Sequence, residues 1–174
     1  MVKIERFPDS RPEEILSPWE ALMRAARTGD EAMALRALAK GADPARRDDA
    51  GEDAIRVAIA EASHREAWPG APARHLEVVE LLAPLVDGGA LDDWGLTVLG
   101  RAVRSGSSEC ARAVLPWADL AVLVDGNLTH RELAAREEEP EIAAMIEAER
   151  ARREKEELSR VLPAAAGAKR PKGL

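Results

Sequence analysis

The sequence is poor in cysteine and in aromatic residues. Its 174 residues include one cysteine, one phenylalanine and no tyrosine, and aromatic residues make up 3% of the chain although 46% of it is hydrophobic. The single thiol, Cys110, excludes an intramolecular disulfide and fits a reducing compartment. No apolar run approaches the roughly 20 residues that cross a bilayer, and the first residues lack the apolar segment of a secretory signal. The sequence therefore predicts a cytoplasmic protein without a membrane association.

Clustered positive charge is also missing. The net charge is −7, and the segment from Glu147 onward carries 8 Lys and Arg against 5 Asp and Glu, so the first 146 residues carry −10. Phosphate neutralisation needs grouped cations, and Lys169, Arg170 and Lys172 are too few to supply them. We therefore expect no nucleic-acid binding. Charged residues make up 33% of the chain, with much Glu and Arg, which is typical of exposed helix faces and favours an all-α fold.

Residues that would indicate catalysis or a metal site are scarce and scattered. None of the three histidines, His64, His75 and His130, has a partner at metal-ligand spacing. His130 follows Thr129 where a helix cap is expected, and Cys110 lies on the core face of a predicted helix, as a small buried hydrophobe does. The sequence predicts no enzyme active site, no metal and no cofactor.

Four segments of the chain can be superposed. Their equivalent starts are Glu20, Asp53, Thr97 and Thr129, at spacings of 33, 44 and 32 residues. Each segment has a short helix rich in alanine, a Gly or polar break, and a second helix with apolar periodicity. Neither helix pair can bury its apolar face alone, so the pairs are expected to stack.

Three motifs carry a resemblance to a known family: Gly41-Ala-Asp43, Gly95-Leu-Thr97 and His75-Leu-Glu-Val-Val-Glu-Leu-Leu82. They resemble the ankyrin repeat, a unit of about 33 residues with a β-turn and two antiparallel helices. The resemblance covers residues 17–149 and implies four repeats in a helical solenoid. It also implies binding through the turn tips and the concave face of the first helices.

The remaining segments of the chain have separate expectations. Residues 1–16 are an N-terminal extension, residues 150–162 extend the last helix, and residues 163–174 are expected to be a disordered basic tail. Residues Ile142 to about Arg160 should form one long helix with Glu and Arg at pairing distances. The fourth repeat departs from the family pattern at Arg131 and Glu138, which is expected of a polar terminal cap.

The second repeat is longer than the others by 11 residues. The extra residues lie at roughly 63–74, and Pro69, Gly70 and Pro72 predict a loop there. Insertions of this kind in repeat proteins lie on one face, often the functional one.

Tryptophans supply the first candidate binding residues. Trp94, beside Asp93, falls in a turn between repeats two and three where the core needs no aromatic side chain, and Trp68 falls in the insertion. Exposed tryptophan is frequent in binding hot spots, although each ring can instead cover its own loop. Trp19 and Trp117 lie at helix ends and are predicted to pack in the core or at its ends.

Arginines supply the second set. Five of them take two equivalent positions in the first helices, and we call them the arginine ladder: Arg24, Arg27, Arg101, Arg104 and Arg136. On the binding side they would suit a partner with carboxylates. The alternatives are solvation or pairing with the aspartates of the adjacent turns, Asp48, Asp49, Asp92, Asp93 and Asp125. Those aspartates are themselves expected to hold backbone amides.

The sequence favours a non-catalytic protein-binding module that is a monomer when free. One alternative is a bacterial immunity or antitoxin-type inhibitor whose partner is a cognate toxic enzyme. Another is a structural protein that self-associates through its C-terminal helix.

Overall fold

The computed structural model describes residues 15–63 and 71–161, and this part of the chain is helical, with one isolated β-bridge between Val124 and Leu128 and no strand. Its α-helices and 3₁₀ helices follow in this order: α1 (Pro18–Thr28), α2 (Glu31–Ala39), α3 (Ala54–Ser63), α4 (Ala71–Leu82), η2 (Ala83–Leu85), α5 (Val98–Arg104), α6 (Ser108–Val114), η3 (Leu115–Trp117), α7 (His130–Arg136) and α8 (Pro140–Val161). The predicted all-α class is confirmed. No described helix is long and apolar enough to cross a membrane.

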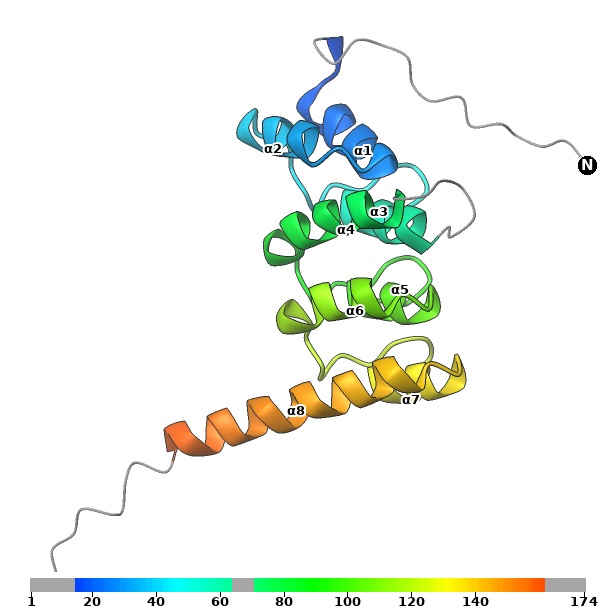
Figure 1. Ribbon diagram of the computed structural model, residues 1–174, viewed down its shortest axis with the longest axis vertical. Helices are drawn as coiled ribbons and strands as arrows, with labels where there is room; N and C mark the ends of the chain where they lie inside the picture. Colours follow the sequence, from blue (N-terminus) through cyan, green and yellow to red (C-terminus); the bar gives the residue numbers. More distant parts are fainter. Residues whose placement is uncertain (1–14, 64–70, 162–174) are drawn as a thin grey trace, which may run out of the picture.

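The helices pack as neighbouring pairs, α1 with α2, α3 with α4, α5 with α6, and α7 with α8. Between pairs, α1, α3, α5 and α7 contact one another in order, and so do α2, α4, α6 and α8. The pairs follow one another along the long axis of the molecule in chain order (Figure 1). The first helices thus form one layer and the second helices another.

Small side chains allow this close packing. Ala25, Ala58, Ala102 and Ala134, one from each first helix, are completely buried. Leucine, isoleucine and valine fill the space around them, including Leu22, Ile55 and Leu99. Because a methyl side chain lets neighbouring helix backbones approach closely, the alanine-rich composition is the direct cause of the tight layer of first helices.

The first turn of α1, α5 and α7 is fixed by a polar cap. Ser17 accepts a hydrogen bond from the Glu20 amide, and Thr97 and Thr129 cap α5 and α7 in the same way. Helix α1 thus begins before Glu20, the residue at which the superposed segment starts. Glu20 is the third helical residue, and its carboxylate accepts from the Ser17 amide to complete a capping box.

Part of the segment 63–74, predicted to be a loop, is helical. Helix α3 continues to Ser63, and α4 begins at Ala71, so the prediction was wrong for 71–74. Pro72 does not prevent helix formation there, because the first amides of a helix have no intrahelical acceptor and proline lacks only that amide. Residues 64–70, including Trp68, lie outside the described residues.

A left-handed residue ends three of the first helices. Gly29 has φ 66° after α1, Gly106 has φ 65° after α5, and Glu138 has φ 60° after α7. A side chain with a Cβ is unfavourable in this conformation, whereas glycine tolerates it. Glu138 is therefore a local departure from the preferred helix ending.

Replacing Glu138 with glycine should stabilise the protein by about 1 kcal/mol, since the strain of the left-handed residue is removed. Urea unfolding measures this difference. Glu138→Ala is the control, because it removes the same carboxylate but keeps a Cβ. Equal stability of the two variants would show that charge, and not backbone conformation, matters at this position.

The last helix, α8, is 22 residues long, as predicted for Ile142 to Arg160. Ile142 and Ile146 anchor its first half in the core. Further along, the Arg153 guanidinium donates to the carbonyl oxygens of Leu115 and Ala118, both at 2.7 Å. Contacts of α8 with the end of η3 thus continue past residue 149, as far as Arg153. The rest of α8 projects past the stacked pairs (Figure 1).

Replacing Arg153 with alanine should cost about 1–2 kcal/mol, because hydrogen bonds from a charged donor to buried carbonyls are lost. Amide hydrogen exchange should accelerate over the last three turns of α8. The matched control is Arg152→Ala. Among the described residues its side chain pairs with Glu149 and Glu156, both on the same helix, and its loss should cost about 0.5 kcal/mol or less. The same exchange pattern in both variants would contradict the anchoring role.

Candidate functional site

Three short turns lie between successive helix pairs, at residues 48–52, 92–96 and 124–128, and we call them the turn row. Each closes with a hydrogen bond between its first and last residues, of 2.8–2.9 Å. Neighbouring turns also touch, because the Asp125 amide donates to the Gly95 carbonyl at 2.9 Å and the Asp93 carboxylate packs against Gly51 with no room for a Cβ. The turns therefore form a continuous edge of the molecule.

Aspartates stabilise two of these turns from within. In each turn one carboxylate oxygen accepts from the amides two and four residues ahead. Asp48 accepts from Ala50 and Glu52 at 2.9 and 3.0 Å, and Asp92 from Trp94 and Leu96 at 2.9 Å each. The predicted structural role of the turn aspartates is confirmed at these two positions.

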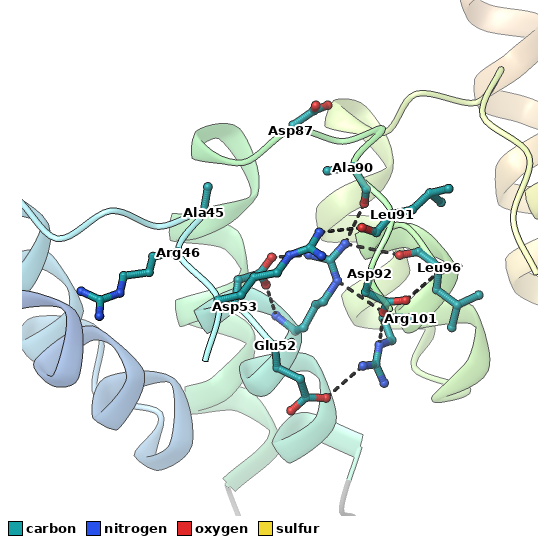
Figure 2. A network of polar contacts seen from close by, with 12 residues as sticks. Ala45, Arg46, Glu52, Asp53, Asp87, Ala90, Leu91, Asp92, Leu96 and Arg101 are labelled. Atoms are coloured by element: carbon teal, nitrogen blue, oxygen red, sulfur yellow. Dashed lines mark hydrogen bonds and ion pairs between the residues drawn. The ribbon is translucent and has the colours of Figure 1, made fainter. Parts of the chain in front are cut away.

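A buried arginine joins the second helix pair to the third. Arg56 of α3 has 1% of its side chain exposed and forms an ion pair with Asp53 at the start of the same helix. Its Nε lies 3.5 Å from the Asp92 carboxylate, and its Nη2 donates to the Ala90 carbonyl at 2.7 Å. We call Arg56, Asp53 and Asp92 the buried cluster, and Figure 2 shows Asp53, Ala90 and Asp92 around Arg56.

Burial and the neighbouring positive charge act in opposite directions on the pKa of Asp53. Burial raises the pKa of the Asp53 carboxyl, and the adjacent Arg56 guanidinium acts against this rise. Each charge is thus expensive to bury alone and is tolerated because an opposite charge and hydrogen bonds accompany it. The cluster fixes the base of the turn at residues 92–96.

Trp94 lies in the turn at residues 92–96, which the buried cluster holds in place through Asp92. The Arg101 guanidinium lies 4.4 Å from the centroid of the Trp94 ring. Arg101 is itself held by Asp92 at 2.6 Å and by Glu52, from the preceding turn, at 2.9 Å (Figure 2). Trp94 as a residue is 49% exposed. An exposed tryptophan is therefore supported on one side by a guanidinium that two carboxylates immobilise.

Most arginines of the arginine ladder form ion pairs with the turn aspartates. This pairing was one of the two alternatives, with solvation, to contact with a partner protein. Arg104 of α5 and Arg136 of α7 share the Asp125 carboxylate, with the Arg104 pair at 3.1 Å, and Arg27 lies 3.7 Å from Asp48. Hydrogen bonds from Arg136, reinforced by both guanidinium charges, lower the pKa of Asp125.

Two further members of the predicted site differ in their surroundings. Arg24 is half-buried on α1, further from solvent than the other ladder arginines at Arg27, Arg104 and Arg136. Asp93 is exposed and pairs with Arg47 at 3.6 Å. The structure therefore brings Trp94, Asp93 and Arg101 together around one turn and places Arg104 and Arg136 at the next.

The other tryptophans test the core-packing prediction. Trp19 packs against the core, and its ring lies 4.2 Å from the Arg46 guanidinium. Trp117 is 54% exposed, so the prediction was wrong for this residue. Leu115 in the 3₁₀ turn η3 and Ala118 directly after it are three apart and are both buried, which leaves Trp117 on the outer side.

Sequence reasoning missed Arg56. Its signal is an arginine inside the apolar run Ala54–Ile59, where every side chain is buried. A charged residue on a helix that is apolar all round must meet counter-charges from neighbouring elements, but the sequence does not reveal that Asp92, 36 positions away, supplies one of them.

The two described histidines and the cysteine are buried. The buried His75 ring Nε2 lies 3.1 Å from the Arg27 carbonyl oxygen, and the buried His130 Nε2 lies 2.7 Å from Thr97 Oγ1. Cys110 is buried as predicted, and burial raises the pKa of its thiol. Across residues 15–63 and 71–161, no group of three or more His, Cys, Asp or Glu side chains is placed to hold a metal ion.

Comparison of the sequence with protein-family models gives no match, and comparison with curated proteins gives no significant similarity.

Proposed function

We propose that the chain is an ankyrin-like repeat protein that binds a partner protein through the turn row, without catalysis of its own. The repeat assignment is supported by the equivalent helix pairs, the common left-handed endings after α1, α5 and α7, and the turns between pairs. Proteins built in this way stack short units and carry specificity in exposed positions of those units.

The observation that carries the proposal is the geometry of Trp94. The residue is half exposed, yet its support is rigid, because Arg101 beneath it is fixed by Asp92 and Glu52. A large side chain that is already ordered loses little entropy on binding. Nothing in the core requires the ring at this place, which favours a role in contact with another protein.

The experiment compares two tryptophans of similar exposure. A partner is isolated from the native host by affinity purification, and its affinity is then measured for the wild type, Trp94→Ala and Trp117→Ala. Loss of a hot-spot tryptophan typically costs about 2 kcal/mol or more, which is about 30-fold in Kd. Trp94→Ala should weaken the complex to this extent, and Trp117→Ala should leave it unchanged.

Thermal unfolding of both variants separates binding from folding, since neither ring belongs to the core and both melting temperatures should stay close to that of the wild type. Full affinity in Trp94→Ala would refute the site. Failure of the wild type to retain any protein from its host would refute the function.

A further inference from the structure

We infer that the partner surface recognised by the turn row is acidic, an exposed protein segment in which carboxylates flank an apolar side chain. The inference rests on the proposed function and specifies the chemistry of the partner. It follows from the exposure of the charged side chains at the turns, where most arginines are more exposed than the carboxylates with which they pair.

In most pairs of the turn row the carboxylate lies inside and the guanidinium outside. The exposed fraction of the side chain is 42% for Arg27 against 20% for Asp48, and 21% for Arg101 against 0% for Asp92. At the third turn it is 38% and 46% for Arg104 and Arg136 against 27% for Asp125. The accessible layer is thus cationic here, although the whole chain carries −7.

The less exposed carboxylates already accept hydrogen bonds within the protein. Asp48 and Asp92 hold the amides of their own turns, and Asp125 accepts from two arginines. Each guanidinium, by contrast, has five N–H donors and can donate further hydrogen bonds. Arg101 uses two of them in hydrogen bonds to Asp92 and Glu52.

Ordering of these arginines in the free protein favours a carboxylate ligand. An arginine that is already held by one carboxylate has lost most of its rotamer freedom, so a second carboxylate binds at a smaller entropic cost. Arg136 also pairs with Glu137 at 2.8 Å, which fixes it further. Beside these groups, Trp94 offers an apolar contact for a side chain between the acidic residues.

A nucleic acid fits this surface less well. A polyanion interacts with the charge of the whole molecule, and the net charge of −7 repels it. A short acidic segment contacts only the cationic layer within a Debye length. Asp49 and Asp93 are the exceptions in the turn row. Both are exposed, Asp93 with 68% of its side chain, and both should oppose an acidic ligand.

The test uses two capped heptapeptides that differ only in charge. One has four glutamates around a central leucine, and the other has four glutamines in their places. Each is titrated into the full-length protein at low salt, and NMR signals of the Trp94 indole N–H and of the Arg101, Arg104 and Arg136 side chains are followed. The glutamate peptide should shift these signals saturably and bind at least about tenfold more tightly than the glutamine peptide.

Substitutions identify the side chains that bind the glutamate peptide. Arg104→Gln combined with Arg136→Gln should weaken the glutamate peptide about tenfold, and Asp93→Asn should strengthen its binding. All three substituted side chains are exposed or partly exposed, and thermal unfolding verifies that the variants remain folded. Arg112→Gln combined with Arg152→Gln is the charge-matched control. Both arginines are exposed on the second-helix layer, where they pair with Glu141 and Glu156, and this variant should bind like the wild type.

The outcomes separate this inference from the proposed function. Equal affinity of the two peptides, no saturable shift, or tighter binding of a short single-stranded DNA would overturn the acidic-partner inference. Dependence of the native partner on Trp94 would in that case leave the protein-binding function standing. Conversely, glutamate-specific shifts with a native complex indifferent to Trp94→Ala would refute the proposed site while showing a carboxylate-binding surface.

Discussion

Replacing Arg56 with alanine should destabilise the protein by about 3–5 kcal/mol, because removal of one partner from a buried ion pair leaves the other charge without compensation. Asp53 loses the guanidinium with which it forms an ion pair, and the carbonyls of Ala90 and Leu96 lose their guanidinium donor. Asp92 keeps Arg101. Chemical denaturation monitored by circular dichroism measures the loss of stability.

A second variant shows whether charge imbalance is the cause. In Arg56→Met combined with Asp53→Ser, both charges are removed, while serine can still accept from the amide of residue 56 as Asp53 does at 3.1 Å. An apolar replacement of similar volume often restores the stability of a broken buried pair. The double variant should therefore be more stable than Arg56→Met alone, which has the same side-chain volume at position 56 but leaves Asp53 charged. If these two variants are equally unstable, the loss comes from the hydrogen bonds to Ala90 and Leu96 that both lack, and not from the buried charge.

The same substitution should also affect the candidate site. Asp92 belongs both to the buried cluster and to the turn that carries Trp94. Loss of Arg56 removes one of the two guanidiniums around Asp92, so the turn is less firmly held. We therefore expect Arg56→Ala to weaken the native complex even under conditions where the protein remains folded.

Local pattern was sufficient to predict much of the fold. Alternation of alanine-rich and apolar-periodic segments predicted the helix pairs, and Thr97 and Thr129 begin helices as their residue types favour. The start of α4 was not predictable in the same way. Proline and glycine near 69–72 indicate a loop, but proline is also accepted in a first helical turn, and only the packing of α4 selects between the two.

Long-range pairing limited the prediction of the site. Spacing in the sequence places the arginine ladder on equivalent positions, but the choice of Asp48, Asp92 or Asp125 as counter-charge depends on how closely consecutive turns stack. The exposure of Trp117 depends in the same way on the short 3₁₀ turn after α6. Such distances arise from tertiary packing, which residue types alone do not specify.

Acid should destabilise the protein through His130. Its ring is buried at the start of α7, and burial lowers its pKa to about 4, although the Asp119 carboxylate partly offsets this effect. The unfolded value is about 6.5. Between these values the folded state binds fewer protons than the unfolded state, so stability is fully present above pH 6.5 and falls as the pH decreases towards 4. The loss between pH 7 and pH 5 should be about 2 kcal/mol.

Comparison with His130→Gln isolates this contribution. Glutamine can keep a hydrogen bond to Thr97 Oγ1, now 2.7 Å from the imidazole, but it does not titrate. Carboxylates with lowered pKa, such as Asp125 and Glu149, whose pKa is about 2, remain in both proteins and cancel in the difference. Urea unfolding at pH 7, 6 and 5 should therefore show the wild type losing its advantage over the variant as the pH falls. A constant difference would mean that His130 is not the acid-sensitive group and that its buried hydrogen bond tolerates the added proton.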